Sequence, residues 1–239
     1  VHREYVEAGS QVVYTNTFGA NGLKLAKTGH SVEEVVSAAV RLAREAAGGR
    51  ARVALDIGPL GQLLEPMGSL PFEQAYQLFG EMAAAGARAG ADLVAIETMT
   101  DLCEARAALL AVKEQTDLPV LVTMSFEASG RTFTGTTVAC MACTLSALGV
   151  DAMGVNCSLG PKEILPLIRE MGEWTAKPLI VKPNAGLPDP ATGQYDMDAA
   201  EFARQMEAFT ALGVHILGGC CGTTPAFIRA LAGLEPAEP

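Results

Sequence analysis

The stretch ADLVAIETMTDLCEARAALLAVKEQTDLPVLVTMSF, residues 91–126, holds two short apolar runs with an Ala-rich segment between them. The runs at 91–98 and 119–126 are apolar over most of their length, which is typical of strands buried on both faces of a parallel sheet. The segment between them is rich in residues that favour a helix. The stretch therefore predicts a strand, a helix and a second strand parallel to the first.

The same alternation continues in both directions along the chain. One Ala-rich segment begins at Ser31 with Glu34 three residues later, which is a capping-box pattern, and it ends at Gly48. The runs that we predict to be strands span residues 11–17, 52–58, 91–98, 119–126, 151–157, 178–184 and 214–220.

Seven such units predict an α/β fold of the (β/α)₈ TIM-barrel type, which needs eight strands. The opening segment 1–9 has the pattern of a helix end, so we expect the first strand and part of the first helix to lie upstream of Val1. No linker or charge block divides the sequence. We expect a single barrel domain over residues 1–233, followed by a proline-rich tail or linker at 234–239.

Composition narrows the classes of partner. The net charge is −10, from 17 basic and 27 acidic residues without a Lys/Arg cluster, which argues against nucleic acid as a partner. No apolar run reaches the roughly 18 residues of a membrane span, and no signal peptide is visible. Six cysteines are too few for a disulfide scaffold. We therefore expect a cytoplasmic protein without a membrane partner.

Three cysteines fall where a barrel carries its chemistry, at the carboxyl ends of the strands. Cys157 ends one predicted strand, and Cys220 and Cys221 end another, two strands later in the sequence. Three thiolates that converge on one point suit Zn²⁺, and a site with three protein ligands leaves a fourth position for water or substrate. The pattern therefore predicts a catalytic zinc site.

Adjacent ligands are awkward on a regular strand because neighbouring side chains point to opposite faces. Gly218, Gly219 and Gly222 would let the backbone turn there, since glycine adopts angles closed to other residues. Two other interpretations remain open. The cysteines could be small buried hydrophobes, or the adjacent pair could form a strained vicinal disulfide.

A second cysteine motif, Cys140-x-x-Cys143, invites a redox or zinc interpretation. It lies in an Ala-rich helical pattern without a second such motif or a paired histidine. Because residues three apart share one face of a helix, we expect both cysteines to lie in the helix core.

The segments GVNCSLGP (154–161) and GGCCGTTP (218–225) resemble the homocysteine S-methyltransferase family. The resemblance covers essentially the whole chain, and MSFEASGRTFTGTT (124–137) and KPNAGLPD (182–189) are most similar to the homocysteine-binding module of cobalamin-dependent methionine synthases. The family normally opens with a first strand carrying an Asp-Gly-Ala/Gly motif, and that segment is not in this sequence.

The resemblance implies a (β/α)₈ barrel with one Zn²⁺ on Cys157, Cys220 and Cys221. It implies that the Asn184 side-chain oxygen fills the fourth position when substrate is absent, and that the Glu97 carboxylate binds the amino group of homocysteine. The other residues it places at the substrate are Thr17 and Phe18. Asp56 is a weaker candidate, because a carboxylate at a strand end can simply hold a neighbouring loop.

The implied reaction is methyl transfer to the sulfur of homocysteine, which gives methionine. A free thiol has a pKa of about 8.5, and a zinc ion favours its thiolate form. The resemblance further implies methylcobalamin as the donor, carried on another domain or partner protein. Three alternatives remain: a standalone enzyme that uses a betaine or sulfonium donor, a lyase or aldolase that forms a Schiff base at Lys182, and a non-catalytic zinc or interaction module.

Overall fold

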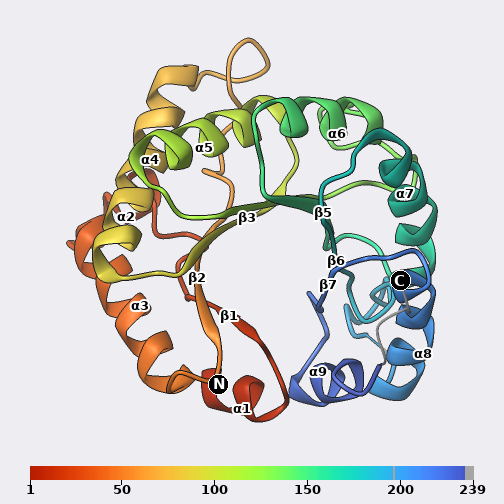
Figure 1. The fold of residues 1–239 in the computed structure, drawn as a ribbon. Coiled ribbons are helices and arrows are strands. Elements are labelled where there is room, and N and C mark those ends of the chain that lie inside the picture. The colour runs from red at the N-terminus through yellow and green to blue at the C-terminus, as the bar shows by residue number, and fades with distance from the viewer. Residues whose placement is uncertain (196, 235–239) are drawn as a thin grey trace.

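The computed structural model describes residues 1–195 and 197–234, and it shows one parallel sheet curled into the inner wall of a barrel (Figure 1). Neighbours in the sheet are consecutive in the sequence, in the order β1 to β7. The strands are β1 (Val12–Tyr14), β2 (Arg52–Ile57), β3 (Leu93–Met99), β4 (Val120–Met124), β5 (Ala152–Asn156), β6 (Leu179–Lys182) and β7 (Ile216–Leu217).

Helices form an outer ring around the sheet (Figure 1). In the described residues they are α1 (His2–Glu7), α2 (Gly22–Leu25), α3 (Val32–Ala47), α4 (Phe72–Ala89), α5 (Leu102–Gln115), α6 (Val138–Ala147), α7 (Pro161–Trp174), α8 (Ala199–Thr210) and α9 (Pro225–Leu231). None of these helices is both long and apolar enough to cross a membrane.

The predicted elements are confirmed, and the local chemistry explains where they stop. Helix α3 begins with the expected capping box, in which the Ser31 side chain accepts from the Glu34 backbone N–H. It ends at Gly48, whose φ of 55° lies in the left-handed region. The seven predicted strands all form in parallel pairs, but each is shorter than predicted. Most lose residues at both ends to the flanking loops, whereas β3 starts two residues late and runs one residue past its predicted end, to Met99.

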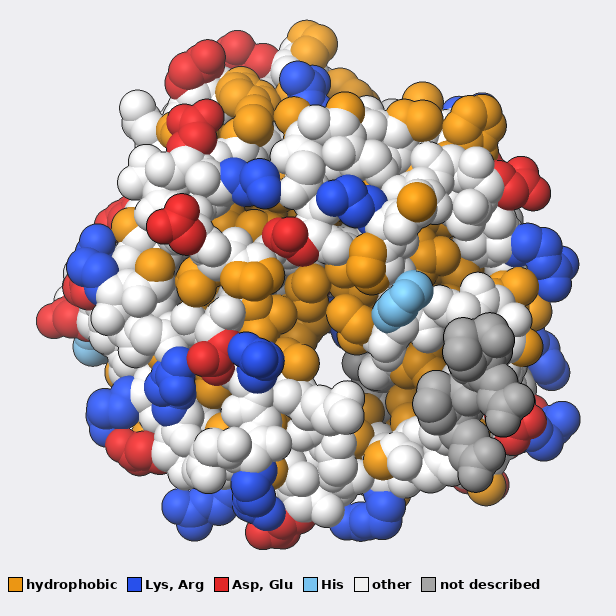
Figure 2. All heavy atoms as spheres, viewed as in Figure 1, with side chains coloured by type: hydrophobic (Ala, Val, Ile, Leu, Met, Phe, Trp, Pro, Cys, Tyr) orange, Lys and Arg blue, Asp and Glu red, His pale blue; other side chains and the backbone are white. Residues whose placement is uncertain are grey.

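The sheet is open between β1 and β7, which stand at its two ends (Figure 1). Figure 2 shows the same face hollowed near the centre, with hydrophobic side chains beside the hollow. Outside the opening α1 and α9 come into contact, and Gly9 is a close point of approach, because a Cβ there would lie 2.9 Å from that of Ala232. The eighth strand of a closed barrel is not among the described residues, and the tail predicted from residue 234 lies outside them from residue 235 onward.

The apolar floor of the barrel is formed by inward side chains that lie further from the carboxyl ends of the strands than the polar residues described below. Alternate residues of a strand point to the same face, and here inward side chains of the five strands β2 to β6 form one small buried cluster with partly buried neighbours on β1 and β7. Its members are Ala54, Leu93, Ala95, Leu121, Ala152 and Ile180, with Val12, Tyr14 and Ile216 packed against them. The next inward positions toward the carboxyl ends of the strands are polar, and they position the site.

Candidate metal centre at the strand ends

The structure brings the three strand-end cysteines together. Cys157 directly follows β5, and Cys220 and Cys221 lie in the turn that follows β7. The three Sγ atoms all lie within 4.8 Å of one another, and those of Cys157 and Cys221 are 3.8 Å apart. A tetrahedral ion with zinc–sulfur bonds near 2.3 Å holds its sulfurs about 3.8 Å apart. Soft thiolate donors at this spacing fit Zn²⁺.

The backbone turns at the site in an unusual way. Thr98, Cys157 and Ser158 are the non-glycine residues of the described chain with positive φ, at 61°, 62° and 58°. Thr98 lies within β3, where the pairing with β4 is irregular, and Cys157 and Ser158 follow β5 directly. Such angles cost of order 1–3 kcal/mol each and persist only where the surroundings hold them. The backbone strain therefore lies on the Cys157 side of the site, and no local sequence pattern predicts it.

Of the three glycines around the cysteine pair, only Gly222 needs its backbone freedom, with φ at 81°. The expectation that Gly218 and Gly219 serve the same purpose is wrong, because neither has a positive φ. They provide space instead. A Cβ on Gly218 would lie 3.0 Å from Cγ of Lys182, and one on Gly219 would lie 2.5 Å from Oγ1 of Thr223.

Asn156 links the ends of three strands beneath the cysteines. Its Oδ1 accepts from the Thr98 backbone N–H at 2.8 Å and from the Thr123 hydroxyl at 2.7 Å. Its Nδ2 donates to Thr98 Oγ1 at 2.8 Å and reaches Cys220 Sγ at 3.9 Å. This fully buried amide therefore orients Cys220 and holds the strained Thr98 backbone. The sequence showed its place at a strand end but not this role.

The segment after β6 braces both cysteine loops. Asn184 Oδ1 accepts from the Cys221 backbone N–H at 3.1 Å, and Pro183 O accepts from the Cys220 N–H at 2.8 Å. The Cys157 N–H donates to Lys182 O at 3.1 Å. The loops that carry the three sulfurs are thus fixed by main-chain bonds to one common segment.

The three thiols differ in acidity because they share one charge. The hydrogen bond from Cys220, together with those from Ser158, Cys221 and Asn184, lowers the pKa of Cys157 to about 6. The same bond to Cys157, and burial, raise the pKa of Cys220, while burial and the Cys157 charge raise that of Cys221. A metal-free site at neutral pH therefore holds one thiolate, and a cation is needed to make it three.

A polar layer, which we define as Tyr14, Asp56, Glu97 and Lys182, lies inside the barrel above the apolar floor. The Lys182 ammonium donates to Tyr14 OH at 3.0 Å and forms an ion pair with Glu97. Burial alone would lower the pKa of Lys182, but Tyr14 and Glu97 outweigh burial and raise it. Lys182 is therefore a charged group and not a free amine.

Comparison with known proteins bears on what this centre does. The family model described as homocysteine S-methyltransferase matches residues 1–234. The chain belongs to the homocysteine S-methyltransferase family. Methionine synthases of Mycobacterium leprae and Mycobacterium tuberculosis are each 32% identical to it over 97% of its length. The chain spans about a fifth of the length of these relatives, at 20% and 21%.

Solved structures of the homocysteine methyltransferase MmuM from Escherichia coli share the fold. The metallated form superposes with a TM-score of 0.83 at 24% identity, and the match covers 97% of this chain and 82% of that one. The apo form gives a TM-score of 0.77 at 26% identity with the same coverage. The predicted barrel fold is thereby confirmed.

Two residues that the family resemblance places at the substrate lie on the loop after β1. The buried Thr17 hydroxyl donates to Asp56 O at 2.6 Å and contacts Thr15 Oγ1 at 2.6 Å, so it ties β1 to β2. Phe18 is partly exposed, and its ring packs against Gly58. In this member of the homocysteine S-methyltransferase family, the side-chain contacts described for both residues are with neighbours of β1, with Lys24 and with β2 and its loop.

The prediction that Cys140 and Cys143 lie in the helix core is wrong. Both are exposed on α6, whose buried face is formed by Val138, Met141, Ala142 and Leu145. The Ala-rich pattern left the orientation of this short helix ambiguous, because apolar residues occur all around it.

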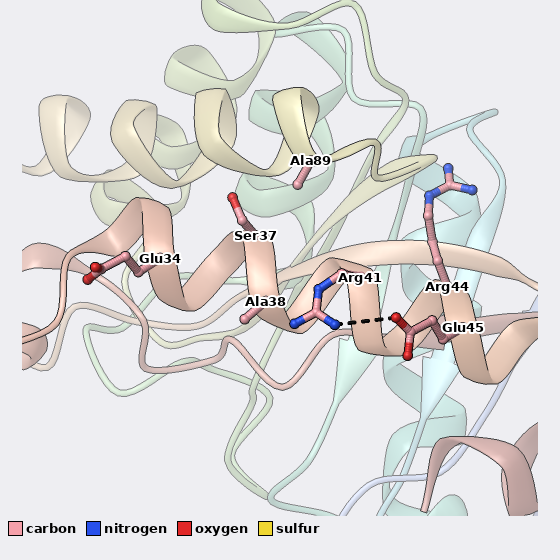
Figure 3. A pocket seen from close by; sticks show the side chains of 7 residues that line it. All are labelled: Glu34, Ser37, Ala38, Arg41, Arg44, Glu45 and Ala89. Atoms are coloured by element: carbon pink, nitrogen blue, oxygen red, sulfur yellow. Dashed lines mark hydrogen bonds and ion pairs between the residues drawn. The ribbon is translucent and has the colours of Figure 1, made fainter.

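A hollow of about 620 Å³ lies on the outer helical ring, beside α3 and the end of α4 (Figure 3). Its lining comes from α3 and the end of α4: Glu34, Ser37, Ala38, Arg41, Arg44, Glu45 and Ala89. The ion pair between Arg41 and Glu45, at 3.3 Å, is exposed, and exposed ion pairs contribute little to the stability of the folded protein. None of the residues that line the hollow is a cysteine or belongs to the polar layer.

Proposed function

We propose that this chain catalyses methyl transfer to the sulfur of homocysteine, giving methionine, with zinc held by Cys157, Cys220 and Cys221. The observation that carries the proposal is the convergence of the three Sγ atoms within 4.8 Å at the strand ends, in a chain of this family. When bound, zinc stabilises the deprotonated form of a substrate thiol and so supplies a nucleophile at neutral pH.

The protein contributes orientation. Asn156 and Asn184 hold the Cys220 and Cys221 loops, so the three sulfurs face one point before a ligand arrives. In this proposal the Asn184 side-chain oxygen, which accepts from the Cys221 backbone N–H at 3.1 Å, would also fill the fourth position when substrate is absent. Outer partners of metal ligands typically change metal affinity 10- to 100-fold when they are removed.

The transfer itself needs no general base at the moment of reaction. The thiol proton leaves to solvent as the substrate binds. The sulfur lone pair then forms the new bond to the methyl carbon, and the bond between that carbon and the donor breaks with its electron pair on the donor. Glu97 binds the substrate amino group in this scheme, and Thr17 and Phe18 lie near the substrate.

The methyl donor that we propose is methylcobalamin on another domain or a partner protein. The 32% identical relatives are named methionine synthases and are about five times longer than this chain, which leaves room in them for further modules. A standalone enzyme that takes its methyl group from a betaine or a sulfonium compound is the second candidate, because this chain covers 82% of the homocysteine methyltransferase MmuM, which leaves little room there for a further module.

The Schiff-base alternative is disfavoured by the state of Lys182. A lysine nucleophile must lose its proton, and a desolvated site usually lowers its pKa for that purpose. Lys182 is instead buried, ion-paired with Glu97 and shifted toward the protonated form.

The test is zinc content and homocysteine binding on the protein, on Cys220→Ala and on Cys140→Ala. We expect one equivalent of zinc, proton release when homocysteine is added, and loss of both in Cys220→Ala only. Methylcobalamin, glycine betaine and a methylsulfonium donor are then compared as substrates with the zinc-loaded protein.

Each other result has a distinct meaning. Zinc binding without homocysteine binding would identify a non-catalytic zinc module. Absence of zinc after loading under reducing conditions would overturn the mechanism, and retention of zinc by Cys220→Ala would move the site elsewhere.

A further inference from the structure

The three strand-end cysteines differ in exposure and in what surrounds their sulfurs. Cys157 and Cys220 are partly buried, and each sulfur has a hydrogen-bond donor from the end of β5 or the turn after it. The donor to Cys157 is the Ser158 backbone N–H, and the donor to Cys220 is Asn156 Nδ2 at 3.9 Å. Cys221 is exposed, so a donor to its sulfur depends on a neighbouring loop.

Tyr195, on the loop between β6 and α8, supplies that donor. Its hydroxyl group is hydrogen-bonded to the Cys221 thiol. An ordinary phenol has a pKa of about 10, so the hydroxyl carries its proton at neutral pH and donates toward a thiolate. The Tyr195 side chain is half-buried and packs against the hydrophobic core, which limits its freedom to turn away.

The ring of Tyr195 lies on the residue that follows Cys221. A Cβ on Gly222 would lie 2.5 Å from Cγ of the ring and 2.7 Å from Cδ2, distances that no real Cβ contact allows. Gly222 also has a φ of 81°, so the missing side chain serves both the turn and the contact with the ring. The ring and the hydroxyl group thus hold Cys221 and its turn together.

The loop that carries Tyr195 is itself fixed. The Asp189 backbone N–H donates to the carbonyl oxygen of Gln194 at 2.8 Å, which folds the loop back directly before Tyr195. At the start of the loop, the Ala185 N–H donates to the carbonyl oxygen of Cys221 at 2.9 Å. The loop therefore meets the Cys221 turn at both of its ends.

We propose that Tyr195 is a positioning residue of the metal centre, whose hydroxyl group donates a hydrogen bond to the Cys221 thiolate and whose ring holds the turn that carries it. This inference rests on the proposed function. Hydrogen bonds to charged groups are stronger than those between neutral groups, and this one favours the thiolate that binds metal over the thiol. It also draws negative charge from one ligand sulfur, which leaves a bound zinc ion better able to stabilise the thiolate of the substrate.

The test uses three variants and two metals. Tyr195→Phe removes the hydroxyl group and keeps the ring, and Tyr195→Ala removes both. Tyr76→Phe is the matched control, because the Tyr76 hydroxyl donates to the Glu114 carboxylate at 2.6 Å on the outer helical ring. Competition with a chromophoric chelator measures zinc affinity. The absorption spectrum of each Co²⁺-loaded protein gives its sulfur-to-metal charge-transfer band.

We expect Tyr195→Phe to bind zinc about tenfold more weakly than the wild type, because a charge-assisted hydrogen bond is lost. Its charge-transfer band should move to longer wavelength, since a thiolate without a donor holds its electrons less tightly. Tyr195→Ala should lose at least as much zinc affinity, because the turn is also released. Tyr76→Phe should match the wild type in both measurements.

Two results overturn the inference and leave the proposed function standing. One is an unchanged zinc affinity and an unshifted band in Tyr195→Phe, which would show that the ring acts by packing alone. The other is an equal loss of affinity in Tyr195→Phe and Tyr76→Phe, which would show a general effect on the fold.

Homocysteine binding to the zinc-loaded wild type is measured separately. Its absence would overturn the proposed function, whereas the two metal measurements need no substrate and still decide whether Tyr195 acts on Cys221. Absence of zinc binding by the wild type would overturn the proposed function and this inference together.

Discussion

The chain carries two pairs of neighbouring cysteines with opposite surroundings. Cys220 and Cys221 lie past the end of β7, where a third sulfur, an amide and a backbone carbonyl meet them. Cys140 and Cys143 have the spacing of a familiar metal or redox motif, yet they lie exposed on α6. Position at the carboxyl ends of the strands, and not spacing along the chain, decides which thiols can act together.

The largest expected effect separates the two pairs directly. Cys220→Ala should lower zinc affinity at least 10³-fold, because a thiolate ligand is lost from a set of three. Cys140→Ala and Cys143→Ala should leave it within twofold. Competition with a chromophoric chelator measures all of these affinities, and a comparable loss in a variant of α6 would break the comparison.

The next effect concerns what surrounds the strand-end sulfurs. Asn156→Ala should weaken zinc binding 10- to 100-fold, because it frees Cys220 and the left-handed Thr98 backbone. Thr137→Ala, which removes the N-cap of α6 beside Cys140, should have no effect on zinc. Chelator competition checks both variants, and equal affinities for Asn156→Ala and the wild type would show that the cysteine loops need no orientation.

Alkylation of the metal-free protein sharpens the contrast in reactivity. The pKa of Cys157 is lowered to about 6, so its thiolate fraction rises about tenfold between pH 5 and pH 7 and then levels off. An ordinary thiol with a pKa of about 8.5 continues to gain reactivity up to pH 9. Mass spectrometry after iodoacetamide pulses gives the alkylation rate of each cysteine. A Cys157 rate that still rises tenfold above pH 7.5 would contradict the lowered pKa of this thiol.

The smallest expected effect extends the comparison from thiols to carboxyls. Burial, and then the Glu97 charge, raise the folded-state pKa of Asp56 to about 8 from an ordinary 3.8, so its protonated form stabilises the fold at low pH and this contribution is lost as pH rises through 8. Asparagine stays neutral throughout. The melting temperature of Asp56→Asn relative to the wild type should therefore rise by a few degrees between pH 5 and pH 9.

Asp117→Asn, on the outer surface, should show no such trend. Calorimetric melts of the metal-free proteins at several pH values measure both differences. Parallel curves for Asp56→Asn and the wild type would mean that this carboxyl is solvated or partnered in solution.

The fold could be predicted because its signals are local. Apolar runs such as 91–98 and the capping box at Ser31 need no knowledge of distant residues. The cysteine cluster was predictable for a related reason, since the carboxyl ends of parallel strands meet at one edge. The lengths of the strands are overestimated because residues that flank a strand, such as 15–17 after β1 and 214–215 before β7, look like parts of the same run.

The rest of the site depends on pairings across the barrel. Lys182 and Glu97 are 85 residues apart, and their ion pair follows from the curl of the sheet, which no local pattern encodes. The positive φ values of Cys157 and Ser158 were equally hidden, because neither residue type favours that region. One signal was available for the polar layer: Tyr14, Asp56, Glu97 and Lys182 all occupy inward strand positions next to the apolar floor.

The left-handed conformation of Ser158 has a consequence for which residues that position can accept. Its φ of 58° is favourable for glycine and tolerable for asparagine, whereas a β-branched side chain is strongly disfavoured there. In a saturation library, position 158 should therefore admit Gly and Asn and reject Val and Ile, although its neighbours on β5 follow the opposite rule. Two residues past the end of β5, the mutational tolerance of the chain thus inverts.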